Sequence, residues 1–266
     1  MANINVRVRG MCATAISKLL LDHGYNIVQA SSKVRNRLNI EFSSEPPDVT
    51  VKDSNIPDHL ILIGRPKAVE DVLSVIVEEL KHVIIWRATP NIHSTIIGRV
   101  VEVLDDGRSI VEISNDGLRG VLRSQEVSVG ELLPVCIERP MFKEFDKILL
   151  SRNIRIIGKR ATLILGRKGV QVSRHIMSKS RRRELITLGL SLRLGRWGVK
   201  WRSSAAYSSL CELAGEVKEL VERGEELLDK ASNMEAYSIL VEGQRLVELG
   251  LTSIAKRRLD EIRGTV

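Results

Sequence analysis

The sequence predicts an α+β protein built from several domains, and three observations lead to this prediction. Short strand and helix patterns alternate over residues 1–91, which predicts a small N-terminal α+β domain. Residues 92–157 contain five short strand patterns separated by turn signals, and residues 158–232 combine strands and helices with a strong excess of positive charge. The last segment, 233–266, is predicted to be helical. With 266 residues, 43% of them hydrophobic, the chain can bury two or three cores.

The first domain is predicted from alternation of period two and from helical spacing. Ile4, Val6 and Val8 alternate with polar residues, and apolar residues recur at helical spacing over Ala13–Asp22 before Gly24. These patterns predict a strand followed by a helix. Three further strands and one more helix are expected at Tyr25–Ala30, Asp48–Asp53, His59–Gly64 and Val69–Lys81.

Residues 92–157 have the pattern of a small β-barrel. The turn dipeptides Asp106-Gly107, Asp116-Gly117 and Val129-Gly130 separate the strand patterns, and such dipeptides are typical of hairpins. Five short strands within one small domain fit an oligonucleotide/oligosaccharide-binding (OB) barrel, with a generic small barrel as the alternative. The five predicted strands are Thr95–Val103, Ser109–Ile113, Leu118–Leu122, Leu133–Glu138 and Ile148–Ile154.

Nearly all the excess charge lies in one segment, Gly158–Arg202. It holds thirteen Lys and Arg residues and a single acid, Glu184, whereas residues 1–157 hold twenty basic and twenty acidic residues. Charge this concentrated in a folded segment indicates a surface for a polyanion, and nucleic acid is the first expectation. Because aromatic residues make up only 3% of the chain, binding is expected to depend on charge more than on base stacking.

Strands and helices also alternate along this basic segment. Ser178 is predicted to cap one helix, and Ser203 or Ser204 a second, long one. Strands are expected at Arg160–Leu165, Val170–His175 and Val199–Arg202, and two last helices at about Met234–Leu249 and Thr252–Arg263.

Several classes of site and of protein are not indicated. Cys12, Cys136 and Cys211 lack metal-ligand spacing and are expected to be small buried apolar residues. The sequence contains no recognisable metal-binding, nucleotide-binding or nucleophile motif, so no metal site is predicted and catalytic residues are not assigned. A charged start and the lack of a long apolar run predict a cytoplasmic protein without membrane association.

Four motifs of the basic segment resemble the ribonuclease E/G family, in particular its archaeal AU-rich-RNA-binding branch. The motifs are Gly158–Leu165 (GKRATLIL), Val172–Ile176 (VSRHI), Leu188–Leu190 (LGL) and Gly198–Ala205 (GVKWRSSA). The order of barrel, basic segment and long helix is similar too. The resemblance implies an S1-like barrel, an RNase H-like region that senses an RNA 5′ phosphate, and endoribonuclease activity on ribosomal RNA precursors. In the archaeal branch a further C-terminal domain follows a segment resembling Leu259–Arg263, so this chain is expected to lack that domain.

The resemblance also implies roles for particular residues. Arg202 and Ser203 match the contacts to the RNA 5′ phosphate, and Gly158 and Thr162 match positions that shape the same pocket. A guanidinium and a hydroxyl beside a helix start suit phosphate oxygens. An arginine that pairs with a glutamate and a serine that only caps a helix are the alternatives. For the run Arg181–Arg183, a solvated basic helix face is the alternative to a contact with RNA. Contacts to the RNA backbone are expected from eight residues: Lys159, Arg160, Arg167, Lys168, Arg174, Arg181, Arg182 and Arg183.

The sequence leaves three functions open. The first is an RNA-binding endoribonuclease that acts on AU-rich single-stranded or loop RNA and on precursor ribosomal RNA, with no tightly bound cofactor and with Mg²⁺ if it is catalytic. The second is a non-catalytic RNA-binding module that serves a partner or a missing catalytic domain. A ribosome assembly factor without preference for a terminal phosphate is a third reading. The sequence makes no prediction of the oligomeric state.

Overall fold

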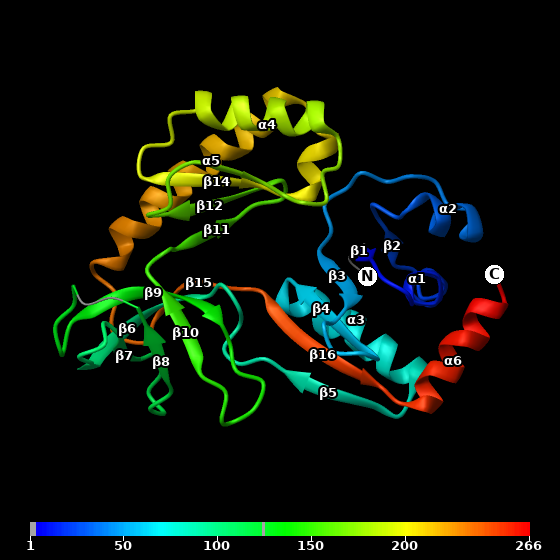
Figure 1. Ribbon diagram of the computed structural model, residues 1–266, viewed down its shortest axis with the longest axis horizontal. Helices are drawn as coiled ribbons and strands as arrows, with labels where there is room; N and C mark the ends of the chain where they lie inside the picture. The colour runs from blue at the N-terminus through cyan, green and yellow to red at the C-terminus, as the bar shows by residue number, and fades with distance from the viewer. Residues whose placement is uncertain (1–3, 124–125) are drawn as a thin grey trace. The chain divides into compact units, whose positions relative to one another are not determined.

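A computed structural model describes residues 4–123 and 126–266 (Figure 1). The chain forms two units. The first combines the chain up to Thr89 with Gln244–Val266, and the second is Pro90–Gly243. The chain therefore leaves the first unit, builds the second, and returns to complete the first.

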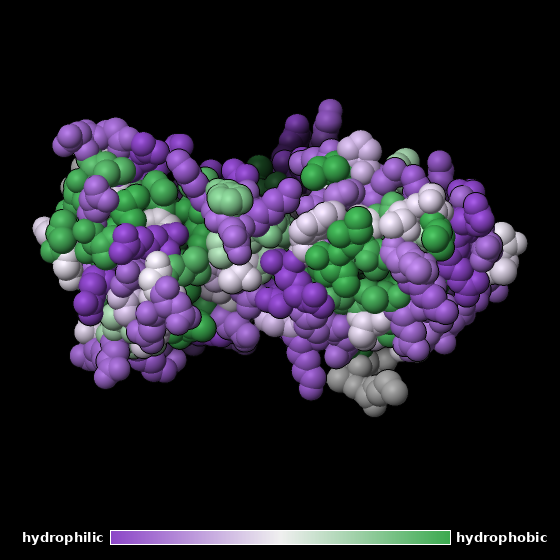
Figure 2. Space-filling model, turned by 90° about the horizontal axis from the view of Figure 1, so that it is seen from below, coloured by the Kyte–Doolittle hydropathy of each residue, from purple (hydrophilic) through white to green (hydrophobic). Residues whose placement is uncertain are grey.

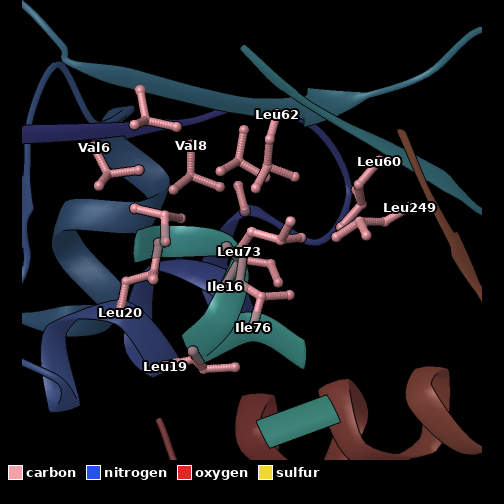
Figure 3. Packing of buried hydrophobic residues seen from close by; sticks show 14 of the residues in the cluster. Val6, Val8, Ile16, Leu19, Leu20, Leu60, Leu62, Leu73, Ile76 and Leu249 are labelled. Carbon is pink, nitrogen blue, oxygen red and sulfur yellow. The ribbon is translucent and has the colours of Figure 1, made fainter. Parts of the chain in front are cut away.

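The first unit is a six-stranded sheet in the order β2-β1-β3-β4-β16-β5 with helices packed on it. Its core contains Val6, Val8, Leu62 and other strand residues, together with helix residues such as Ile16 and Leu73, as Figure 3 shows. Period-two alternation aligns the buried strand positions on one face. The elements are β1 (Asn5–Val8), α1 (Ala13–Asp22), β2 (Asn26–Ile27), α2 (Ser32–Leu38), β3 (Val49–Asp53), β4 (His59–Gly64), α3 (Pro66–Leu80), β5 (Val83–Arg87), β16 (Arg245–Leu251) and α6 (Ser253–Gly264).

The helix predicted at Met234–Leu249 is wrong, so the last segment is not all helical. Two strands, at Ile239–Val241 and β16, lie in this region, and β16 lies between β4 and β5, where Val247 and Leu249 are fully buried. Pairing with two strands that are distant in sequence decides the structure here, because tertiary contacts override a short local periodicity. The last predicted helix is confirmed as α6, which Thr252 caps by accepting a hydrogen bond from Ala255 N.

The second unit begins with the predicted closed barrel of five strands, which is confirmed. The order β6-β7-β8-β10-β9 is closed by pairing of β6 with β9, and β15 (Ile239–Val241) adds to β6. The interior is filled by Val100, Val111, Val135 and Ile148. The barrel strands are β6 (Thr95–Val103), β7 (Ser109–Glu112), β8 (Arg119–Leu122), β9 (Leu132–Arg139) and β10 (Ile148–Ser151).

A four-stranded sheet in the order β11-β12-β14-β13 follows the barrel. Leu185 of helix α4 and Val217 of helix α5 pack with Leu163 and Trp201 in one core, so both helices lie on the same face of the sheet. The elements are β11 (Arg155–Ile157), β12 (Ala161–Leu165), β13 (Val170–Val172), α4 (Lys179–Ser191), β14 (Trp197–Trp201), a 3₁₀ turn at Ser203–Tyr207 and α5 (Leu210–Ala231).

The start of the long helix differs from the prediction. Helix α5 begins at Leu210, and Ser209 forms a capping box with Glu212, whereas Ser203 opens the 3₁₀ turn. A serine with a glutamate three residues later satisfies two helix-end donors, which neither Ser203 nor Ser204 can do with the residues that follow them. Ser204 instead donates its hydroxyl hydrogen to the carbonyl oxygen of Lys159 at 2.7 Å.

Each unit also exposes large hydrophobic side chains. Ile84 on β5 is 53% exposed and Leu132 on β9 is 45% exposed. Figure 2 shows hydrophobic patches between hydrophilic side chains on the face that it presents. Scattered apolar exposure of this kind is ordinary for a protein surface.

Candidate nucleic-acid interface

The face of the four-stranded sheet that points away from α4 and α5 carries the positive charge of the region. Strand pairing aligns Thr162, Lys200 and Gln171 in one row across β12, β14 and β13. Arg155, on β11, has the same orientation because its register partner is Ile164, two residues beyond Thr162. We call the surface formed by Arg155, Arg167, Gln171, Lys200 and Arg202 the basic sheet face.

Lys200 lies among three arginines of this face. Partial burial, followed by the positive charges of Arg155, Arg167 and Arg202, lowers the pKa of the Lys200 ammonium. The carboxylate of Glu138 opposes the shift but does not overcome it. Among the residues that the structure describes, Lys200 has no carboxylate partner within ion-pair distance. Like charges so close together form a region where an anion is favoured.

Contacts with residues of the barrel region hold the side chain of Arg155 in place. Its Nη2 donates to both carboxylate oxygens of Glu138, at 2.8 and 2.6 Å, and its Nη1 lies 3.1 Å from Nε2 of His93. The Arg155 side chain is only 18% exposed. Its charge is therefore partly balanced, and it connects the sheet to strand β9.

The loop between β12 and β13 passes directly over the basic sheet face. A Cβ atom on Gly198 would come within 1.8 Å of the carbonyl oxygen of Arg167, so only glycine allows this approach. With its amide oriented to satisfy both partners, Gln171 accepts hydrogen bonds from Nε and Nη2 of Arg167, at 2.9 and 3.0 Å. The guanidinium of Arg167 is thereby held over the sheet while remaining exposed.

The structure brings the predicted 5′-phosphate residues together at one end of the same sheet. Arg202 follows β14, and its Nη1 donates to the carbonyl oxygen of Gly158. Burial lowers the pKa of the Arg202 guanidinium, and the carboxylate of Glu216 opposes that shift. Thr162 is buried on β12, next to Lys200 in register, and Ser203 is half-buried directly after Arg202.

The turn between β11 and β12 already binds a carboxylate of the protein itself. Glu216 of α5 accepts hydrogen bonds from the backbone N–H groups of Arg160 and Ala161, at 2.7 and 3.2 Å. The Arg160 side chain pairs with the same carboxylate at 3.5 Å and donates to the hydroxyl of Ser208 at 2.7 Å. A Cβ atom on Gly158 would lie 2.5 Å from this carboxylate, so glycine leaves room for it.

Besides Arg160, two more of the predicted backbone-binding arginines have side-chain contacts within the fold, in both cases with carbonyl oxygens. Arg181 donates to the carbonyl oxygens of Ala205, at 2.8 Å, and of Ser208. Arg182 donates to the carbonyl oxygen of Ser173 at 2.8 Å. Five others are exposed side chains of the second unit: Lys159, Arg167, Lys168, Arg174 and Arg183.

Sequence reasoning missed three members of the basic sheet face, Gln171 and the two cations Arg155 and Lys200. A signal for Lys200 was present, because Trp197, Val199 and Trp201 alternate with it and are buried. That alternation places Lys200 on the face opposite the core. Arg155 carries the same signal, because Ile154 and Ile156 on either side of it are buried.

Other chemical groups in the described ranges say less about the function. Within residues 4–123 and 126–266, no three His, Cys, Asp or Glu side chains are grouped closely enough to hold a metal ion. Cys136 is buried, and burial raises the pKa of its thiol to about 12, whereas Cys211 is exposed and the prediction that all three cysteines are buried is wrong for it. Among the residues that the structure describes, no helix is long and apolar enough to span a bilayer.

Comparison with known proteins finds relatives in archaea, whereas no family model matches the chain. The chain is 38% identical over 263 residues to a protein of Staphylothermus marinus named probable ribonuclease FAU-1. Proteins of the same name in Ignicoccus hospitalis and Pyrococcus horikoshii are each 34% identical to this chain, over 265 and 283 residues. These alignments cover 98–100% of this chain but only 54–55% of the relatives. The chain is thus related to the archaeal FAU-1 proteins and spans about half of their length.

Proposed function

We propose that this chain, as a relative of the archaeal FAU-1 proteins, is an RNA-binding ribonuclease. The observation that carries the proposal is the basic sheet face, where Lys200 and Arg167 lie close together and, among the described residues, neither has a carboxylate partner. A cluster of this kind is electrostatically unfavourable in the free protein and becomes favourable when phosphate groups lie on it.

The chemistry of this face suits the RNA backbone. Arg167 offers a planar set of donors, already oriented by Gln171, and Lys200 supplies a compact charge beside it. Neither requires a particular base. The proposal is therefore that affinity comes from phosphate contacts and that binding weakens steeply as salt is added.

The finer assignments rest on the resemblance of the motifs. In this proposal the five-stranded barrel is S1-like, the four-stranded sheet with α4 and α5 is RNase H-like, and the chain shares the plan of ribonuclease E/G. The RNA would be AU-rich single-stranded or loop RNA, including precursor ribosomal RNA, in the cytoplasm. Few aromatic side chains are available, so AU preference would come from the flexibility of such strands rather than from stacking.

Recognition of a 5′ phosphate is assigned to the end of the sheet at Arg202. Arg202 and Lys200 both reach this end, and Ser203 and Thr162 supply hydroxyl groups beside them. Glu216 occupies the neighbouring backbone donors of Arg160 and Ala161. The terminal phosphate would consequently bind on the side of Lys200 and Arg202, and not at the turn.

Cleavage is proposed because the relatives are named ribonucleases. Phosphodiester hydrolysis commonly requires a metal-activated water, so cleavage is expected to need Mg²⁺. The second candidate function is binding without cleavage, with this chain delivering RNA to another domain. The observation that favours it is that the best-defined site in the described ranges is a set of cations rather than of carboxylates.

One experiment tests both functions. An AU-rich RNA, prepared with a 5′ monophosphate or a 5′ hydroxyl, is incubated with the chain in Mg²⁺ or in EDTA, and binding and products are followed together. Binding without products supports the binding function, and products that appear only with Mg²⁺ support the nuclease. Failure to bind either RNA at low salt overturns the proposed function.

A further inference from the structure

A small pocket lies at the edge of the four-stranded sheet, beside β13 and the last turn of α4. Its volume is about 350 Å³, and its apolar surface is provided by Val170, Leu190, Leu194 and Trp197. Gly189 makes the pocket possible, because a Cβ atom there would come within 2.6 Å of Val170 and force α4 away from the strand. The pocket is therefore a product of close packing between helix and strand.

Two cations stand at the rim of this apolar surface. Lys168 and Arg193 both line the pocket and both are exposed. In the part of the chain that the structure describes, neither side chain has an ion-pair partner. An apolar floor with cations at its edge suits a ligand that is flat and apolar in its centre and anionic at its ends, as a nucleotide is.

The pocket continues the basic sheet face through one short loop. Arg167 belongs to that face and the next residue, Lys168, belongs to the pocket. Gly166 and Gly169, with φ of +74° and +101°, turn the chain sharply on either side of them. An RNA backbone that passes along Arg167 would therefore remain close to a positively charged side chain when it reaches Lys168.

We propose that this pocket is a nucleotide subsite, in which one RNA base lies on the apolar floor and Lys168 and Arg193 bind its flanking phosphates. The volume is at the small end of the range for ligand pockets, which suits one nucleotide rather than a larger ligand. The subsite rests on the proposed RNA-binding function and adds to it a contact with a base. Because the ring of Trp197 is 3% exposed and the rest of the floor is aliphatic, the contact does not distinguish strongly between bases.

The test compares two strands and three variants. A single-stranded RNA of about a dozen nucleotides, a length suited to such sites, is compared with a strand of equal length in which abasic riboses replace the nucleotides. Affinities are measured by fluorescence anisotropy for the wild type, Leu190→Asn, Leu210→Asn and Lys200→Met. Leu190 is 65% exposed and Leu210 is 42% exposed, so both asparagine variants are expected to fold, and only Leu190 lines the pocket.

We expect Leu190→Asn to weaken binding of the base-containing strand about five- to tenfold, as for loss of one base contact. Binding of the abasic strand should be unchanged, and Leu210→Asn should bind both strands like the wild type. Equal weakening of both strands by Leu190→Asn overturns the base contact. If Lys200→Met weakens binding while Leu190→Asn has no effect, the subsite is overturned and the RNA-binding function stands. If the wild type binds neither strand, the proposed function itself fails.

A second measurement does not depend on any variant. RNA carrying a photoreactive uridine is cross-linked to the wild-type chain, and the modified peptides are identified by mass spectrometry. Cross-links at residues 168–170 or 189–197 support the subsite. Cross-links confined to other segments overturn it.

Discussion

The carboxylate of Glu216 accepts a hydrogen bond of 2.7 Å from the backbone N–H of Arg160 and a second, of 3.2 Å, from that of Ala161. This contact connects the second turn of α5 to the turn between β11 and β12. The Glu216 side chain is only 12% exposed, so its charge is stabilised mainly by these donors and by Arg160. The end of the sheet that carries Arg202 is therefore shaped by an acid on α5.

Replacement of Glu216 by alanine should destabilise the second unit. The change removes a mostly buried charge from two amides and leaves Arg160 without its nearest carboxylate, which we expect to cost about 3 kcal/mol. Denaturant unfolding measures the loss. Glu219→Ala is the control, because Glu219 is exposed on the same helix, and it should change stability by no more than about 0.5 kcal/mol. Equal stability of the two variants would contradict the structural role of Glu216.

The predictions from sequence succeeded where local patterns determine the structure. The five barrel strands were predicted because turn dipeptides such as Asp106-Gly107 separate them, and the cap at Ser178 was predicted because its side chain can reach a nearby amide. Strand β16 was mistaken for helix, because its position between β4 and β5 depends on partners far away in sequence.

The same limit applies to the candidate site. Composition alone located the charge, within Gly158–Arg202, but it could not separate its members by role. Arg181 and Arg182 bind carbonyl oxygens of the fold, whereas Lys200 faces three arginines. The register of the four strands shows which strand cations lie side by side, and register depends on pairings between segments that are distant in sequence.

Lys200→Met should weaken RNA binding and raise the thermal stability of the free chain. The ammonium contributes one phosphate contact, so its loss should reduce the dependence of log affinity on log salt by about one unit. The same change relieves repulsion from Arg155, Arg167 and Arg202, so the melting temperature should increase. Lys218→Met, at an exposed position on α5, is the matched control and should alter neither property. A lower melting temperature for Lys200→Met would show that the cations do not repel one another.

Alkaline pH should weaken RNA binding by the wild type more than RNA binding by Lys200→Arg. Because the pKa of Lys200 is lowered from the ordinary value of 10.5, the ammonium loses its proton earlier than other lysines as pH rises. RNA affinity should therefore fall earlier in the wild type than in the variant, whose guanidinium stays charged. Anisotropy titrations with an RNA of adenosine and cytidine, at constant ionic strength, measure the difference.

As pH rises through the same range, the stability of the free wild-type chain should increase, whereas its RNA affinity should fall. Folding disfavours the charged form of Lys200, so this group destabilises the free chain while it is protonated in both the folded and the unfolded state. The penalty disappears as pH rises from the lowered pKa towards 10.5, and the stability gained by Lys200→Met should disappear with it. A gain that is constant across this range would contradict a titrating Lys200.

Gly198→Ala should destabilise the sheet and weaken RNA binding together. A methyl group there would come within 1.8 Å of the carbonyl oxygen of Arg167, so the loop must move and the Arg167 guanidinium must leave its place above Gln171. Overpacking of this kind is expected to cost about 3 kcal/mol. Gly215→Ala is the matched control, because no atom outside its own helix lies near that position, and alanine should stabilise α5 by about 1 kcal/mol. If Gly198→Ala binds RNA like the wild type, Arg167 does not need its observed position to contact the backbone.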